Sequence, residues 1–249
     1  MPIGVTFRGM MAAAGVSGYT CDAADFDGAN DYMSRGADLT GNANSKLGIV
    51  SFWIKMAADG SVLRIIDGQG TYNNVQRSAD NTMRLYFLNG STTLARNTTS
   101  TFVIANGWVH YMASWDLSGP TVHIYRNGVD DDAGGGTLLD NAIDYTRTDH
   151  YAGSASGGGS KWDGDIADLY YAPGQYLDLS NSANRDKFYL AGKPVDLGAD
   201  GSTPTGTAPL VFFHLDDGEA AANFATNRGT GGDYSITGTL ATASTSPTD

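Results

Sequence analysis

Short stretches in which apolar and polar residues alternate recur along the chain. Residues 49–55 alternate in this way, with Phe52 and Ile54 on one face, which predicts a strand. Residues 108–115 alternate too and the chain returns over residues 121–126, so this pair predicts a β-hairpin. Further apolar stretches predict strands at residues 62–66, 83–88, 164–171 and 209–215. The predicted strands are short, and Gly, Asn, Asp and Pro cluster between them as turn residues.

One helix is expected, over about residues 181–190, with Ser180 as its N-cap and Gly192 near its C-terminus. Residues 130–160 are polar and Gly-rich and are expected to form surface loops around brief strands. Many short strands with almost no helix indicate a single antiparallel β-sandwich. We expect three parts: an N-terminal arm at residues 1–20 that anchors the domain, the sandwich with a C-terminal extension at residues 21–236, and a fraying polar tail at residues 237–249.

The composition supports an all-β protein. Of the 27 acidic residues 26 are Asp, Glu219 is the sole Glu, and Lys occurs only five times against 33 Gly. Glu and Lys are typical of helix surfaces, whereas Asp and Gly are typical of turns. The net charge of -12 and the pI near 4.5 exclude the phosphate backbone of nucleic acid as a main partner.

The cysteine content and the lack of targeting signals limit where the protein is expected to be made and located. Cys21 is the sole cysteine, so the chain has no intrachain disulfide and no zinc site built on cysteines. Arg8 interrupts the apolar start where a signal peptide needs an unbroken apolar segment. No run of 18 apolar residues predicts a membrane-spanning helix. We therefore expect a protein made in the cytoplasm, with no membrane partner.

Four segments resemble, in order, the strands of concanavalin A-like, laminin-G-type jelly rolls. They are Phe-Asp-Gly-Ala-Asn-Asp-Tyr at residues 26–32, residues 49–55, the hairpin of residues 107–128 with its Asn-Gly turn, and residues 161–171. The resemblance implies an antiparallel jelly roll of the concanavalin A-like lectin/glucanase superfamily. Such folds carry lectins, hydrolases, adhesion modules and virion proteins, so fold alone does not imply function.

A second resemblance concerns the segment after the sandwich. Residues 184–188 and 192–201, followed by Pro204 and Pro209, are similar to tails on such domains in tailed-phage and prophage proteins. This implies a non-catalytic structural or decoration protein of a tailed-phage virion, on the capsid or tail surface. It would be made in the host bacterial cytoplasm, would contact other virion proteins, is expected to be a homo-oligomer and could adhere to host glycan. The alternatives are a secreted carbohydrate-binding adhesion module and a divergent glycoside hydrolase.

Glycan binding requires aromatic platforms together with Asp and Asn hydrogen-bonding groups. The candidates in or near predicted loops are Tyr72, Asn73, Asn74, Tyr145, Tyr151 and Tyr176. The competing interpretation is that these tyrosines cover a sandwich edge and keep only their hydroxyls in water.

The strongest catalytic pattern is Asp163, Asp165 and Asp168, which has the spacing of the Glu-x-Asp-x-x-Glu strand of related glucanases. Asp is one methylene shorter than Glu, and a retaining mechanism needs two carboxyls about 5–5.5 Å apart. The lone Glu219 cannot supply the missing pair. We therefore expect no enzyme, with these carboxylates capping loops instead.

No cofactor is expected, and the identity of any metal is left open. The oxygen-rich loops make calcium the candidate ion. However, the acidic run at residues 130–132 is not a spaced cage, because adjacent carboxylates on an extended strand point to opposite faces. His110 and His123 both fall in the central hairpin, where they are expected to face each other as a cross-strand packing pair, with a metal pair as the alternative.

Overall fold

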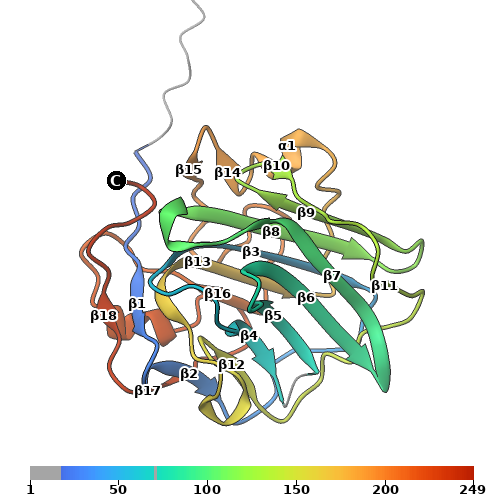
Figure 1. The fold of residues 1–249 in the computed structure, drawn as a ribbon, viewed down its shortest axis with the longest axis horizontal. Helices are drawn as coiled ribbons and strands as arrows, with labels where there is room; N and C mark the ends of the chain where they lie inside the picture. The colour runs from blue at the N-terminus through green and yellow to red at the C-terminus, as the bar shows by residue number, and fades with distance from the viewer. Residues whose placement is uncertain (1–17, 70–71) are drawn as a thin grey trace, which may run out of the picture.

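The computed structural model describes residues 18–69 and 72–249, in which two large antiparallel sheets pack face to face (Figure 1). The first sheet has the order β10-β9-β8-β3-β13-β1-β18, and β16 also pairs with β13. Its strands are β1 (Ala24–Asp27), β3 (Leu47–Met56), β8 (Val109–Asp116), β9 (Thr121–Arg126), β10 (Val129–Asp130), β13 (Asp163–Pro173), β16 (Val211–Phe213) and β18 (Ala241–Thr242). The predicted antiparallel sandwich and its β8–β9 hairpin are confirmed.

The second sheet has the order β11-β7-β6-β5-β4-β12-β2-β17. Its strands are β2 (Tyr32–Arg35), β4 (Leu63–Gly68), β5 (Asn73–Arg77), β6 (Thr82–Asn89), β7 (Ser91–Thr101), β11 (Thr137–Leu138), β12 (His150–Ala152) and β17 (Ser235–Thr237). β5 and β7 were not expected, because their sequences are largely polar and contain few apolar residues to mark an inward face. Cross-strand pairing to β6 on both sides holds them in the sheet.

The main core lies between the two sheets. The inward side of β3 contributes Val50, Phe52 and Ile54, all with no exposed surface. Trp115 of β8 lies in the same core, and Gly48 makes room for it, since a Cβ at that glycine would lie 2.1 Å from the Trp115 ring. The large apolar side chains expected between two layers are therefore present, and the glycine in β3 is explained by this close approach.

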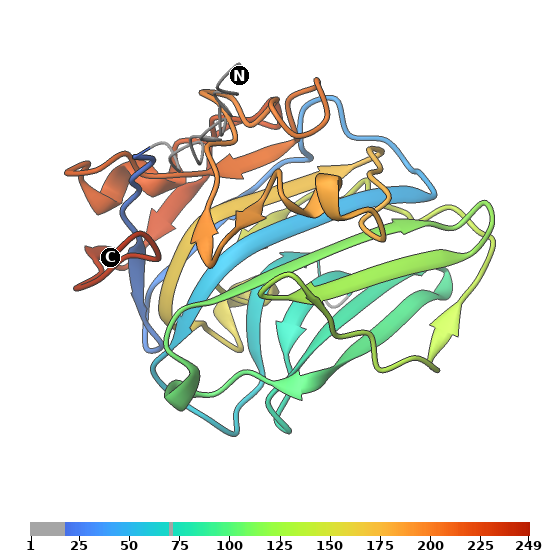
Figure 2. The ribbon, with the colours of Figure 1, turned by 90° about the horizontal axis from the view of Figure 1, so that it is seen from above.

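A third layer covers the outer face of the first sheet. Residues 174–210 follow β13 and lie along this sheet on the side away from the second sheet (orange in Figure 2). Phe188 and Leu197 from this layer form a second buried cluster with Ile49, Met112 and Tyr170 of the sheet. A small sheet of β14 (Tyr189–Leu190) and β15 (Lys193–Pro194) belongs to the same layer.

The expected helix is much shorter than predicted. α1 covers only Ser182–Arg185, and its N-cap is Asn181, whose side chain accepts from the backbone N–H of Ala183. Phe188 is buried against the sheet, and the chain then turns into β14 instead of extending the helix. The other helical turns are η1 (Ile104–Asn106), η2 (Ser156–Gly158) and η3 (Ala221–Ala225), all 3-10. Within the described residues, no helix is long and apolar enough to cross a membrane.

The two ends of the described chain meet on the first sheet. The prediction of a fraying tail at residues 237–249 is wrong, because β18 pairs with β1 and the ammonium group of Lys193 donates to the carbonyl of Thr248 at 2.9 Å. The predicted arm at residues 1–20 lies outside the described residues except for residues 18–20, which lead into an isolated bridge between Asp22 and Leu215.

Candidate functional site

Tyr72 presents an aromatic ring at the surface immediately before β5. The residue is 43% exposed, and the Arg147 guanidinium lies over the ring, 4.5 Å from its centroid. Nη2 of Arg147 is 2.9 Å from a carboxylate oxygen of Asp144, which balances the charge of the guanidinium. One ring face is therefore supported by a fixed cation, so the ring can act as a platform without first becoming ordered.

A groove of about 530 Å³ lies among the loops beside this ring. It is lined by Gly36, Ala37, Asp38, Gln69, Thr146, Arg147 and Thr148. Oδ1 of Asp38 holds these loops together, since it accepts hydrogen bonds from Nε2 of His150 at 2.9 Å, Nδ2 of Asn42 at 2.9 Å and the backbone N–H of Arg147 at 3.2 Å. Asp38 thus fixes one wall of the groove.

The His150–Asp38 pair has a definite protonation state. Burial would raise the pKa of Asp38, but the hydrogen bonds from Asn42, His150 and the Arg147 backbone outweigh burial and lower this pKa below its ordinary value. Burial lowers the pKa of His150 and outweighs the opposing effect of Asp38. At neutral pH the pair is therefore a carboxylate and a neutral imidazole, with the Nε2 hydrogen directed at the carboxylate.

The other predicted glycan-binding residues are buried from solvent to different degrees. Asn73 and Asn74 begin β5 and are buried, and Nδ2 of Asn73 donates to the carbonyl of Asp144 at 2.6 Å. Tyr145 is 1% exposed; its hydroxyl accepts from Nε1 of Trp115 at 2.8 Å and donates to a backbone carbonyl. Tyr151 is half-buried in β12. Of these residues, Tyr72 alone offers a well-exposed ring. Tyr145 lies in a loop as expected, but its ring is buried and cannot serve as a surface platform.

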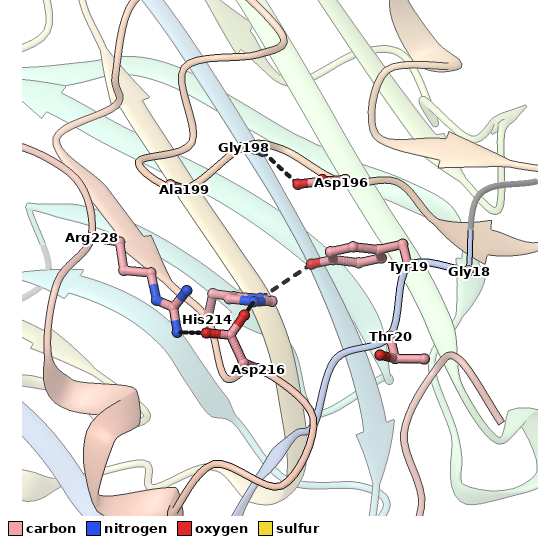
Figure 3. A pocket seen from close by; sticks show the side chains of 9 residues that line it. All are labelled: Gly18, Tyr19, Thr20, Asp196, Gly198, Ala199, His214, Asp216 and Arg228. Atoms are coloured by element: carbon pink, nitrogen blue, oxygen red, sulfur yellow. Dashed lines mark hydrogen bonds and ion pairs between the residues drawn. The ribbon is translucent and has the colours of Figure 1, made fainter.

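A second cavity, of about 540 Å³, lies on the third-layer side of the first sheet (Figure 3). It is lined by Gly18, Tyr19, Thr20, Asp196, Gly198, Ala199, His214, Asp216 and Arg228. His214, just after β16, makes two carboxylate contacts: Nδ1 is 2.6 Å from Asp168 and Nε2 is 3.1 Å from Asp216. The hydroxyl of Tyr19 donates to both oxygens of Asp168 at 3.1 Å. The cavity therefore lies over a closed network of charged groups.

The electrostatics of this network follow from its two carboxylates. Burial would lower the pKa of His214, but the hydrogen bond and charge of Asp168, with the hydrogen bond of Asp216, raise this pKa above its ordinary value. Hydrogen bonds from Arg228 and His214 lower the pKa of Asp216. Nη2 of Arg228 also contacts Glu219 at 2.7 Å. Both ring nitrogens of His214 face carboxylates, an arrangement that favours the imidazolium form as a counter-charge for the buried carboxylate.

The three aspartates of the glucanase-like pattern do not act together. In the register of β13 with β1, Asp163 lies opposite Asp27 and Asp165 lies opposite Asp25. Burial, and the charge of Asp25, raise the pKa of Asp165 to about 6 despite Lys55 at 3.5 Å. Asp168 lies at a β-bulge with φ of 49°, is 3% exposed and has both oxygens engaged. Asp168 is therefore committed to Tyr19 and His214, and the three carboxylates have different partners.

The prediction that His110 and His123 face each other is wrong. The hairpin register places Ser114 opposite His123, and His110 lies beside Asn127. His110 is buried between aromatic rings, and this burial lowers its pKa to about 3. His123 lies 3.4 Å from Asp178 instead. These separate environments also exclude the alternative of a metal pair.

Among residues 18–69 and 72–249, no cluster of three or more His, Cys, Asp or Glu side chains is placed to hold a metal ion. In the acidic run, Asp130 accepts from the backbone N–H of Asp132, and Asp131 accepts from the N–H of Ser100 at 2.9 Å. Asp130 thus supports its own turn, whereas Asp131 ties this loop to β7.

Several residues of the two cavities escape sequence reasoning. Asp38 and Arg147 lie in polar loops with no motif, and their partners are about a hundred positions away. The sequence does give one indication for His214, because it directly follows the apolar stretch Val211–Phe213. A polar side chain at the end of a buried strand needs a hydrogen-bond partner. Tyr19 gives no such signal.

The fold and the match to a family agree. A family model described as the concanavalin A-like lectin/glucanases superfamily matches residues 27–171. The chain belongs to this superfamily, as its sequence resemblance implied. A search of the curated proteins finds no match.

Solved structures resemble the chain at low sequence identity. A Bacteroides ovatus protein to which carbohydrate binding is attributed is 13% identical, with a TM-score of 0.62 over 91% of this chain and 61% of that one. The present chain thus spans about three-fifths of that protein's length. A heptameric SAP-like pentraxin from Limulus polyphemus is 15% identical, with a TM-score of 0.49 over 66% of this chain and 81% of the pentraxin. At these identities the likeness shows the fold alone.

Proposed function

We propose that the protein is a non-catalytic carbohydrate-binding module that holds a glycan in the groove beside Tyr72. The observation that carries the proposal is the exposed ring of Tyr72, which is stacked on Arg147, a residue that also lines a groove of polar side chains. A sugar ring presents an apolar face that stacks on an aromatic ring and hydroxyls that bond to groups such as Gln69 and Thr146.

The charges beside the groove favour an uncharged glycan. Asp38 is ionised because its pKa is low, and the positive charge of Arg147 is already balanced by Asp144. An acidic sugar would therefore meet the Asp38 carboxylate, and Arg147, the cation among the described residues that line the groove, is already paired. Neutral hexoses are therefore the class of ligand that this groove would bind best.

Two further features support a binding role at this groove. The third layer covers the outer face of the first sheet with the chain's own apolar residues, which leaves less sheet surface open to a ligand. The similar fold of the Bacteroides ovatus protein, to which carbohydrate binding is attributed, agrees with this role.

A glycan array screened with the full chain, followed by calorimetry on the best ligand, tests the proposal. We expect Tyr72→Ala to weaken binding by at least about tenfold, the loss of one stacking platform. Tyr176→Ala, on the segment after β13 of the other sheet, is the matched control and should bind as the wild type does. Equal affinity of the wild type and Tyr72→Ala, or a preference for sialylated over neutral ligands, would contradict the proposal.

The virion role expected from the sequence stays a prediction, as does the alternative of a secreted adhesion module. Many copies on one particle would multiply weak glycan contacts through effective concentration. Mass spectrometry of purified particles from the source culture, with the copy number of this chain, tests that role. Absence from particles would favour the adhesion module.

A further inference from the structure

The segment of residues 18–22, named here the N-terminal strap, runs between two cavities. The cavity of about 540 Å³ lies on its Asp196 side, and a cavity of about 340 Å³ lies on its Lys193 side. Gly18, Tyr19 and Thr20 line both. The strap thus separates two open spaces along the surface of the third layer.

The strap is held mainly by side chains. No backbone hydrogen bond joins residues 18–20 to another described residue, and the first such bond is from the N–H of Asp22 to the carbonyl of Leu215 at 3.1 Å. Tyr19 instead anchors the strap through its hydroxyl on Asp168 and its ring, whose centroid is 5.9 Å from that of His214. Closure of the strap therefore depends on the Asp168–His214 pair.

Charged and titratable groups surround the strap and this pair from every element packed against them. They are Tyr19, Cys21 and Asp22 from the strap, Asp168 from β13, Lys193 and Asp196 from the third layer, Asp216, Glu219 and Arg228 from the segment after β16, and Asp249 from the tail. Burial raises the pKa of both Tyr19 and Cys21, so these two groups stay neutral well above neutral pH. His214 is the group among these whose proton is lost first as the solution becomes alkaline.

We propose that the N-terminal strap is a proton-controlled latch, which protonated His214 holds closed over Asp168 and which opens when His214 loses that proton. In the closed state, both ring N–H groups of His214 face carboxylates, and Asp168 is 3% exposed. Loss of one proton leaves the buried carboxylate with the neutral Tyr19 hydroxyl and Cys21 thiol as partners and without a counter-charge, which is costly in a buried site. The latch then favours a state in which Asp168 reaches water and the two cavities join.

The direction of the pH dependence follows from the raised pKa of His214. The closed state raises this pKa, so its stabilising effect is complete below the open-state value and is lost as the pH rises through the closed-state value. The opening equilibrium gains up to about tenfold for each pH unit by which the closed-state pKa exceeds the open-state pKa. Acidification over the same range keeps the latch closed.

Cys21 is a built-in probe of the opening. It belongs to the strap, is 1% exposed and is the sole cysteine of the chain, so any thiol label reports this position alone. The experiment measures the rate of Cys21 alkylation by iodoacetamide between about pH 6 and pH 9. Each rate is divided by the rate for the same chain unfolded in urea, which removes the ordinary growth of the thiolate fraction. Tryptophan fluorescence confirms that the labelled chain is folded.

We expect the normalised rate to rise with pH in the wild type and to be independent of pH in His214→Gln. His123→Gln, which changes a histidine away from the strap, should keep the wild-type rise. Should His214→Gln fail to fold, Asp216→Asn removes one of the two carboxylates and should shift the rise to lower pH. A flat wild-type profile, a rise that persists in His214→Gln, or an unshifted rise in Asp216→Asn would overturn the latch.

Discussion

The groove beside Tyr72 and the cavity beside Tyr19 are each built around a histidine that contacts an aspartate, but the pKa values of the two histidines move in opposite directions. His150 contacts one partly exposed carboxylate, that of Asp38, and burial dominates to lower its pKa. His214 contacts two carboxylates, those of Asp168 and Asp216, and together they overcome burial and raise its pKa. The number and depth of the acidic partners therefore decide whether a buried histidine is neutral or charged.

This difference separates two structural roles. At the groove, the neutral imidazole of His150 donates one hydrogen bond that orients Asp38. Removing this imidazole would change the shape of the groove wall that Asp38 forms. In the cavity, the imidazolium supplies the charge that allows Asp168 to be buried at all. We therefore expect the second pair to matter more for stability than the first, although both look alike as His–Asp contacts.

The largest expected effect comes from Asp168→Asn. Asn is one of the few residues that tolerate the φ of 49° at this bulge, so the change removes charge without straining the backbone. We expect the free energy of unfolding to fall by about 3 kcal/mol, as when one partner of a buried ion pair is removed. Urea denaturation at neutral pH measures the change. Asp165→Asn on the same strand is the control, and equal losses in the two variants would refute the special role of Asp168.

A pH titration of stability should separate the two histidines. The raised pKa of His214 stabilises the fold at low pH, and that stability is lost as the pH rises through the folded-state value. The lowered pKa of His150 stabilises the fold above its unfolded value near 6.5, and that stability is lost as the pH falls through the folded-state value. A folded-state pKa that differs from the unfolded-state pKa by one pH unit changes the free energy of unfolding by roughly 1.4 kcal/mol.

His214→Gln should flatten the alkaline side of the stability profile, and His150→Gln should flatten the acid side in part. The part that remains on the acid side is expected from His110, whose pKa is also lowered by burial. Denaturation midpoints measured across the pH range check both. If either substitution flattened the opposite side, the assigned protonation states would be wrong.

The smallest of these effects is expected from Asp38→Asn. The side chain is 38% exposed, so solvent screens its charge, and the amide oxygen can still accept a hydrogen bond. We expect a loss of about 1 kcal/mol in the free energy of unfolding, together with weaker glycan binding because the groove wall is less well fixed. Calorimetry and urea denaturation on the same preparation check the two parts. A loss as large as that of Asp168→Asn would remove the distinction between the two pairs.

The sandwich itself could be predicted from the sequence because its strands carry local patterns. The alternation in residues 108–115 and the returning apolar stretch at residues 121–126 specify the hairpin within a few positions. The Asn-Gly pair after residue 126 instead turns the chain from β9 into β10. The strand β7 could not be predicted, since its eleven residues are mostly polar and its place depends on pairing with β6. The position of β7 in the sheet is set by its pairing with β6 and not by the pattern of its own residues.

The candidate sites were predicted less well, for a related physical reason. Tyr72 was singled out because an aromatic residue beside two Asn in a polar stretch is a local signal; its ring is exposed, and its part in glycan binding stays a prediction. The groove wall around Asp38 depends on His150, 112 positions away, and the cavity network joins Tyr19 to Asp168 across 149 positions. Such contacts leave no periodicity in the sequence, and only the sheet register brings them together.

The third layer on the first sheet bears on where this module can be cut or grafted. The family match ends at residue 171, yet Ile49, Met112 and Tyr170 on the outer sheet face depend on Phe188 and Leu197 for their cover. A cassette trimmed to the matched stretch would present those apolar side chains to water and invite self-association. The family match and the packed domain therefore end at different residues. A fusion built from this domain should keep the third layer as well as the matched residues.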